Sequence, residues 1–314
     1  IECIESGWIS SDGPFVEKFE KDFANYIGVD YGIAVCNGTA ALETALFAAG
    51  VEKGDEVIMP SFTIISCALA AIRLGAVPVL VDSEPETWNM DTKQIEGRIT
   101  SRTKVIMPVH IYGHPVDMDP VMEIAKKYNL IVIEDAAEVH GAEYKKRKCG
   151  SIGHIACFSF YANKIITTGE GGMVVTSDKN TAAKAKSYRN LCFRPEKRFY
   201  HTELGNNYRM TNMQAALGVA QMERIEEFIL IKRRLGEYYH KELSTINGIK
   251  TQWEKPWAKT VYWMYCIELD QSLSINADEM MRRLGEKGIG TRPFFLGLHE
   301  QPVLHKLGLF KNEQ

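Results

Sequence analysis

Strand-like and helix-like segments alternate over the first two-thirds of the chain, and this alternation restricts the fold more than any other feature. The predicted strands are short runs rich in β-branched residues, at 31–36, 55–60, 77–82, 103–110, 130–137, 156–161 and 171–177. Stretches such as 37–50 and 119–129 lie between them and have the composition of helices. Because strands that alternate with helices form right-handed crossovers, we predict an α/β fold with a largely parallel sheet.

The pattern changes after residue 211. Residues 212–243 read as one long helix, followed by a strand at 261–269 and a helix at 277–288. We therefore predict a large domain over 1–211, and over 212–314 a long linking helix with a smaller α+β domain. The chain starts without an initiator Met and stops without a closing element, so we expect residues to be missing at both ends.

Composition excludes several classes of protein. The 314 residues include 37 Lys and Arg against 40 Asp and Glu, a formal charge of −3, which gives no electrostatic reason to expect nucleic acid or an anionic membrane as a partner. Seven scattered cysteines, an odd number, fit a reducing compartment better than a disulfide framework. No apolar run is long enough to span a membrane, and no signal peptide is evident. We predict a cytoplasmic protein.

Several segments resemble motifs but have simpler explanations. In "HEQPVLH" the second His follows the first by six residues, whereas the helical zinc motif needs four, so we predict no metal site. "KKRK" at 145–148 is interpreted as a solvated β-turn. We assign the C-terminal aromatic residues to the core of the small domain; they are Trp253, Trp257, Tyr262, Trp263 and Tyr265.

Residues 37–39, Asn-Gly-Thr, lie where a predicted strand passes into a predicted helix. Free N–H groups and the positive end of the helix dipole favour an anion there, and Gly38 would let a phosphate approach closely. The alternative is a helix cap. For an isolated Asn-Gly-Thr, the cap is the better explanation.

Two ionisable side chains follow later strands. Asp135 comes at the end of "LIVIED", where a buried carboxylate requires a cationic partner such as a protonated ring nitrogen. A carboxylate that caps the next turn explains it equally well. Lys164 lies in "SFYANKIITTGEGG", five residues after Ser159, and a lone lysine in a turn is usually solvated.

Taken together, these features are a phosphate cradle, a buried acid and a lysine on loops at one edge of a sheet, where open α/β sheets bind ligands. Pyridoxal 5'-phosphate requires those three groups: a phosphate site, a carboxylate for its pyridine nitrogen, and a lysine amine for covalent attachment.

Motifs along nearly the whole chain resemble one known family. They are "SGWISSDGPFVEKFE", "NGTAAL", "GDEVIMPSFT", "PVHIYG", "IEDAAEVHGA", "GSIG", "FSFYANKIITTGEGGM", "LGNNYRMTNMQAALG" and "RPFFLGLHEQPV". In this order they are similar to the DegT/StrS family of nucleotide-sugar aminotransferases, which are fold-type I pyridoxal-phosphate enzymes. The resemblance implies a large domain with a mostly parallel sheet and a smaller C-terminal α+β domain.

The resemblance also implies roles for individual residues. Lys164 would hold the cofactor covalently and catalyse the reaction. The remaining cofactor-binding residues would be Asp135 at the pyridine nitrogen, Glu138 near the ring hydroxyl, and Gly38, Thr39 and Ser159 at the phosphate. Asn207 matches an Asn that reaches the phosphate from the neighbouring subunit, which implies a homodimer with shared active sites. Arg209, Arg292 and His299 would contact the sugar or its diphosphate.

The implied reaction moves an amino group from glutamate to a nucleotide-linked 4-keto-6-deoxy sugar. Two alternatives remain: a regulatory member of the same fold that binds the cofactor without turnover, and a different pyridoxal chemistry such as dehydration. The presence of Lys164 argues against dehydration, since a dehydrating relative has His there. Ile64 stands where we expect an aromatic residue against the cofactor ring.

Overall fold

The computed structural model describes residues 1–194, 196–197 and 199–311. Its main sheet has seven strands in the order β1-β9-β8-β5-β4-β2-β3. Their bounds are β1 Tyr31–Val35, β2 Glu56–Pro60, β3 Val77–Val81, β4 Thr103–Ile106, β5 Ile131–Asp135, β8 Ile155–Ser159 and β9 Gly172–Thr176. Only β9 runs antiparallel to its neighbours β1 and β8, so the predicted α/β fold with a mostly parallel sheet is confirmed.

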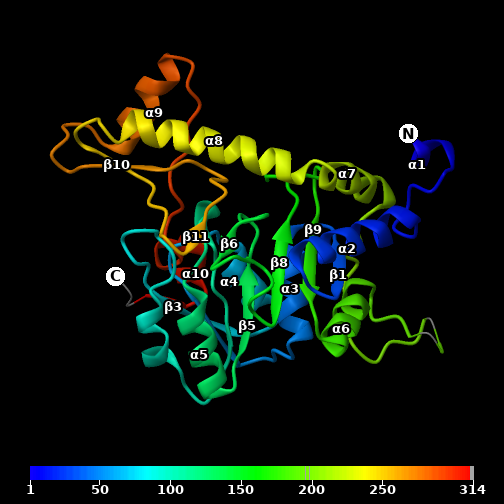
Figure 1. Ribbon diagram of the computed structural model, residues 1–314. Helices are drawn as coiled ribbons and strands as arrows, with labels where there is room; N and C mark the ends of the chain where they lie inside the picture. The colour runs from blue at the N-terminus through cyan, green and yellow to red at the C-terminus, as the bar shows by residue number, and fades with distance from the viewer. Residues whose placement is uncertain (195, 198, 312–314) are drawn as a thin grey trace.

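Helices cover both faces of this sheet (Figure 1). The helices near the sheet are α2 Pro14–Ile27, α3 Gly38–Ala48, α4 Ser66–Arg73, α5 Met118–Tyr128, α6 Lys179–Arg189 and α10 Pro302–Lys306, with 3-10 turns at Thr92–Gln94, Glu96–Arg98, Ile111–Gly113 and Leu298–Glu300. The short helix α1, Glu2–Glu5, lies outside them near the N-terminus. Successive strand residues point to opposite faces. On β5, Val132 joins a buried cluster with α5, and Ile133 joins a cluster with α3, α4 and α6. The sheet is thus the middle of three layers.

The C-terminal part begins with two helices, so the prediction of one helix over 212–243 is wrong. These are α7, Asn212–Met222, and α8, Ile225–Leu243, and Arg224 between them has non-helical φ and ψ of −123° and 9°. The break directs α7 along α2 and sends α8 across the top of the molecule in Figure 1. The residues on both sides of the two-residue break have the composition of a helix. Composition therefore does not reveal where one helix ends and the next begins.

The predicted strand at 261–269 is also largely wrong. Only Ile267–Leu269 is extended, as β12, and it pairs with β10, Ile249–Thr251. Tyr262 has φ of +46°, a left-handed conformation that does not continue a strand. The helix predicted at 277–288 is present as α9, Ala277–Glu286.

A small three-stranded sheet contains the basic tetrapeptide. Its strands are β6 Glu143–Tyr144, β7 Arg147–Lys148 and β11 Ala258–Lys259. Lys145 and Lys146 are exposed between β6 and β7, which confirms the predicted solvated turn. The division of the chain at residue 211 remains a prediction. None of the helices in the described ranges has the length and apolar composition needed to cross a membrane.

Candidate active site

Three of the predicted site residues lie at the ends of neighbouring elements. Asp135 is the last residue of β5, Ser159 is the last residue of the adjacent parallel strand β8, and Gly38 begins α3 directly after β1. Carboxyl ends of parallel strands meet at one edge of a sheet, and open α/β sheets bind ligands there. The topology therefore brings these residues to one place.

Lys164 follows β8 and is not a solvated turn residue. Its backbone N–H donates to the carbonyl of Tyr161 at 2.9 Å, and its side chain is 10% exposed. The amine Nζ lies 3.7 Å from Oε1 of Glu138 and 3.8 Å from the centre of the Trp263 ring. Burial lowers the pKa of the Lys164 amine, while the charges of Glu138 and Asp135 oppose that shift. The geometry gives a sequestered amine beside a carboxylate.

Glu138 is buried beside this amine. Its Oε2 accepts a hydrogen bond from the backbone N–H of Tyr112 at 2.7 Å. Burial raises the pKa of Glu138 to about 7, reinforced by the charge of Asp135 and opposed by Lys164. Glu138 can therefore gain or lose a proton near neutral pH, beside an amine whose pKa is lowered by burial.

Asp135 has two hydrogen-bond donors within the protein. The backbone N–H of Ala137 donates to Oδ1, and the thiol of Cys67 on α4 donates to Oδ2, both at 3.1 Å. The first contact is the turn cap considered from the sequence. Two neutral donors leave acceptor capacity on a buried carboxylate, so the cap does not exclude a cationic partner.

Gly38 and Ser159 form the cradle expected for a phosphate. A Cβ added to Gly38 would lie 2.8 Å from Cβ of Ser159 and 3.2 Å from its hydroxyl, so only glycine fits this approach. Asn37 caps α3 by accepting from the N–H of Ala40 at 2.8 Å, while the first N–H groups of the helix have no acceptor within it. Thr39 donates its hydroxyl to Ser66 at 3.0 Å. The helix cap at Asn37 therefore does not prevent Gly38 and Ser159 from forming an anion site.

The other predicted site residues have different partners from those of Lys164, and one of them, Arg209, forms a β-bridge with Val35, three residues before Gly38. Asn207 is exposed, and the side chain of Arg209 donates to Asn190 at 2.6 Å. Arg292 is exposed, and His299 is half-buried in a 3-10 turn. Within the described part of the chain, no hydrogen bond or ion pair joins any of these four to Lys164.

Three side chains at the site are not predicted as site residues: Cys67, Trp263 and Tyr112, although Tyr112 lies within the motif "PVHIYG". The Tyr112 ring is nearly parallel to that of Trp263, at 13° and 6.3 Å between centres. The sequence predicts Trp263 in a small-domain core, and this prediction is wrong because its ring covers Lys164. The aromatic set in fact divides, since Trp253 is exposed and Trp257 packs on Tyr144. Spacing along a sequence does not distinguish these environments.

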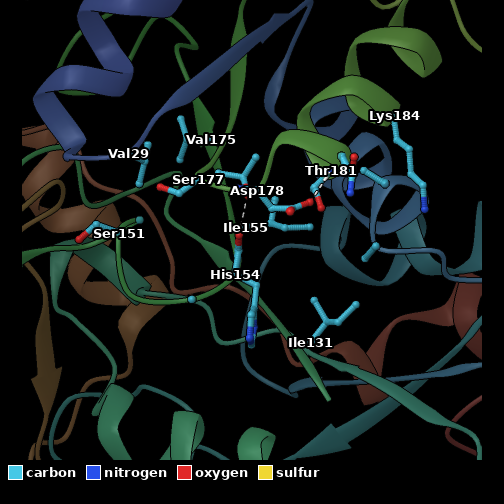
Figure 2. A pocket seen from close by; sticks show the side chains of 16 residues that line it. Val29, Ile131, Ser151, His154, Ile155, Val175, Ser177, Asp178, Thr181 and Lys184 are labelled. Atoms are coloured by element: carbon cyan, nitrogen blue, oxygen red, sulfur yellow. Dashed lines mark hydrogen bonds between the residues drawn. The ribbon is translucent and has the colours of Figure 1, made fainter. Parts of the chain in front are cut away.

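Hollows lie at both edges of the sheet. One of about 210 Å³ reaches Lys164 from the side of α8 and is lined by Asn163, Lys164, Ile165, Phe228, Ile231 and Lys232. The larger, of about 630 Å³, lies at the far edge of the sheet, where β5 and β8 begin (Figure 2). Some of its polar groups already bond within the chain: the backbone N–H of Val132 donates to the His154 ring, and that of Thr181 donates to Asp178. Only the smaller of these two hollows is lined by Lys164 and therefore adjoins the candidate active site.

These features match the needs of one cofactor. A sequestered lysine, a strand-end carboxylate and a glycine-hydroxyl cradle at a helix N-terminus suit the aldehyde, pyridine nitrogen and phosphate of pyridoxal 5'-phosphate. Fold and site together define the class of fold-type I pyridoxal-phosphate enzymes.

Comparison with known sequences narrows the class. The chain belongs to the DegT/DnrJ/EryC1/StrS aminotransferase family, whose model matches residues 1–313. It is 47% identical to GDP-perosamine synthase of Caulobacter vibrioides over 96% of this chain and 82% of that protein. It is 43% identical to GDP-perosamine synthase of Escherichia coli O157:H7, again over 96% of this chain and 82% of that one.

Comparison with solved structures supports the same family assignment. The fold superposes on S. venezuelae DesV with a TM-score of 0.91 and 34% identity, covering 97% of this chain and 81% of DesV. The predicted family, the fold and pyridoxal phosphate as cofactor are thereby confirmed. The protein is a pyridoxal-phosphate-dependent aminotransferase.

Proposed function

We propose that this aminotransferase moves an amino group from glutamate to a nucleotide-linked 4-keto-6-deoxy sugar and that its product is GDP-perosamine. The relatives named GDP-perosamine synthase support the sugar and the nucleotide. One structural observation carries the chemistry: the Lys164 amine is buried 3.7 Å from Glu138 at the edge where the cradle lies. In bulk water most of the amine would be protonated, and only its neutral form attaches to an aldehyde or accepts a proton.

Lys164 has two tasks in this proposal. The bound cofactor supplies an electron sink for the carbon that loses a proton. Lys164 attaches the cofactor and, once its Nζ is free, accepts that proton and delivers it to the carbon that gains one. Burial lowers the pKa of this amine, which raises the fraction of the neutral, proton-accepting form.

In this proposal, the carboxylates of Glu138 and Asp135 position the amine and the cofactor relative to each other. Glu138 lies within reach of Nζ and, with a pKa of about 7, can hold the proton that Lys164 carries. Asp135 is fixed by Ala137 and Cys67 and would face the pyridine nitrogen. Gly38, Thr39 and Ser159 would hold the phosphate through backbone N–H groups and hydroxyls.

We further propose that the enzyme is a homodimer in the cytoplasm. Asn207 is exposed and has no contact with Lys164 within the described ranges, which suits a side chain that completes the site of a second copy. Arg209, Arg292 and His299 are the proposed contacts to the sugar diphosphate. All seven cysteines are free, which agrees with a reducing compartment.

Borohydride trapping tests the covalent step. Reduction of the holoenzyme, digestion and mass spectrometry should place the cofactor on the peptide that contains Lys164. The Lys164→Ala variant should lose this label, and its turnover should fall by more than about a thousandfold. Lys184→Ala, at an exposed position on α6, is the control and should keep both. A label on another lysine would refute the assignment.

A panel of keto-sugar nucleotides tests the substrate. With glutamate as donor, mass spectrometry should find the aminated sugar when the acceptor is the GDP-linked 4-keto-6-deoxy sugar. Bound cofactor with no half-reaction on glutamate would instead identify a regulatory protein.

Subunit mixing tests the shared site. Lys164→Ala and Asn207→Ala, each impaired alone, should recover part of their activity when mixed, because one of the two sites in the heterodimer then has both residues intact. No recovery from subunits shown to exchange would refute the contribution of Asn207 across the interface.

A further inference from the structure

A side chain from the C-terminal part of the chain lies over the Lys164 amine. Trp263 is 6% exposed, and its ring centre is 3.8 Å from Nζ of Lys164. The indole N–H donates to the carbonyl of Asn163 at 2.9 Å. Since Asn163 immediately precedes Lys164, one indole contacts both the amine and the backbone turn that carries it.

Trp263 is itself held from two further directions. Its carbonyl accepts a hydrogen bond from the Lys232 amine on α8 at 2.9 Å. Its ring lies nearly parallel to that of Tyr112, whose backbone N–H donates to Glu138. The ring position is therefore coupled to the carboxylate that faces Lys164, and three separate segments fix it.

We propose that Trp263 is a positioning residue for Lys164: its ring face holds the protonated amine beside Glu138, and its N–H fixes the turn that carries the lysine. The inference rests on the proposed role of Lys164 as the reactive amine. It assigns to Trp263 the task of keeping the free amine within reach of the reacting carbons, and of stabilising it after it has accepted a proton.

A cation over an aromatic face is attracted by the ring quadrupole, most strongly over Trp and in a site shielded from water. The ring also excludes water from the amine. These two actions have opposite effects on the amine, because the quadrupole favours the charged form and the loss of water disfavours it. A substitution that keeps the apolar bulk and removes the π-system separates them.

The titration of Lys164 depends on a small set of ionisable neighbours. Glu138 and Asp135 attract the ammonium, and His140 lies close enough for Lys164 to affect its pKa. Lys232 lines the same hollow from α8. None of these four neighbours is substituted in the variants below. A change in the Lys164 pKa can therefore be attributed to the Trp263 ring.

The experiment measures the Lys164 pKa in cofactor-free protein by competitive acylation across a pH series, with mass spectrometry of its peptide. Trp263→Leu keeps an apolar side chain without a π-face and should lower the pKa by about one unit. Trp263→Phe keeps an aromatic ring that attracts a cation less strongly, and its Lys164 pKa should lie between those of the wild type and Trp263→Leu. Trp257→Leu removes a tryptophan that packs on Tyr144 and should leave the pKa unchanged.

In the holoenzyme, Trp263→Leu should lower kcat about tenfold with little change in KM for either substrate, since the ring acts on the amine. An unchanged or raised Lys164 pKa in Trp263→Leu would overturn the inference. Should that variant fail to fold, an unchanged pKa in Trp263→Phe would do the same. Failure of borohydride trapping at Lys164 would refute the proposed function, whereas the pKa, which is measured without cofactor, separately tests the contact between the Trp263 ring and the amine.

Discussion

Glu134 and Glu138 lie four residues apart at the end of β5, are 0% and 6% exposed, and nevertheless differ in character. Glu134 accepts four hydrogen bonds, at 2.9, 2.7, 2.8 and 2.5 Å, from the His110 ring and from the backbone N–H groups of Gly150, Ile152 and Gly153. Burial pushes the pKa of Glu134 upward, but these donors outweigh burial and the pKa is lowered.

Glu138 has far fewer donors. One backbone N–H, from Tyr112, donates to it, and the ammonium of Lys164 lies at 3.7 Å. Burial therefore prevails, and the pKa of Glu138 rises to about 7. Asp135, between them in the chain, has two donors within the protein. The two glutamates are both buried, but Glu134 stays ionised whereas Glu138 can exchange a proton near neutral pH. The number of hydrogen-bond donors around each carboxylate accounts for this difference in pKa.

The largest effect is expected at Glu134. Glu134→Gln removes the charge from a site with four donors and turns an amide N–H₂ toward some of them, so the free energy of unfolding should fall by about 3–5 kcal/mol. Urea denaturation of cofactor-free protein measures this. Because the folded pKa of Glu134 is depressed, its stabilisation is present above the unfolded pKa of about 4.3, and the deficit should shrink as pH falls below that value.

Glu143→Gln is a matched control, since Glu143 is partly exposed and pairs with Lys259 at 2.8 Å. Its cost should stay below about 1 kcal/mol. Equal losses at Glu134 and Glu143 would mean that the buried donors contribute nothing beyond an ordinary surface pair.

A smaller effect of opposite sign is expected at Glu138. Its pKa is raised on folding, so the wild type loses stability as pH rises from about 4.5 to about 7. Glu138→Gln does not titrate, and its stability relative to the wild type should therefore increase by about 2–3 kcal/mol between pH 5 and pH 8. Unfolding of both cofactor-free proteins across this range provides the test. A relative stability that does not change with pH would contradict the contrast with Glu134.

The smallest effect is expected at Cys67. Cys67→Ala removes one of two donors from Asp135 and should destabilise the protein by about 1–2 kcal/mol more than Cys157→Ala, which removes a thiol of equal burial from the neighbouring strand. Cys67→Ser keeps a donor and should recover most of that difference. If the two alanine variants lost equal stability, the thiol would act only by filling space.

Much of this site was predictable because strand ends are local features. Asp135, Ser159 and Gly38 each follow or terminate a short apolar run, and the parallel topology brings such positions to one edge. The residues alone also drew attention to Lys164, and family resemblance added its catalytic role and the role of Glu138. Asn207, Arg209, Arg292 and His299 remain predictions, since the described part of the chain joins none of them to the amine.

The unpredicted residues share a different property. Cys67 lies 68 positions from Asp135, and Trp263 lies 100 positions from Asn163, the residue to which its indole donates. Neither has a periodic or motif signal, because its partner is set by how distant segments pack. The break between α7 and α8 and the left-handed Tyr262 were missed for the same reason.

The sequence by itself determined the alternation of strands and helices, and with it the edge of the sheet at which the acid, the lysine and the glycine meet, because periodicity and strand ends are local properties. Only the tertiary structure decided which of two neighbouring glutamates stays ionised and what covers the amine. Protonation depends on burial and on the number of donors at each oxygen, and those donors come from segments far apart in the chain.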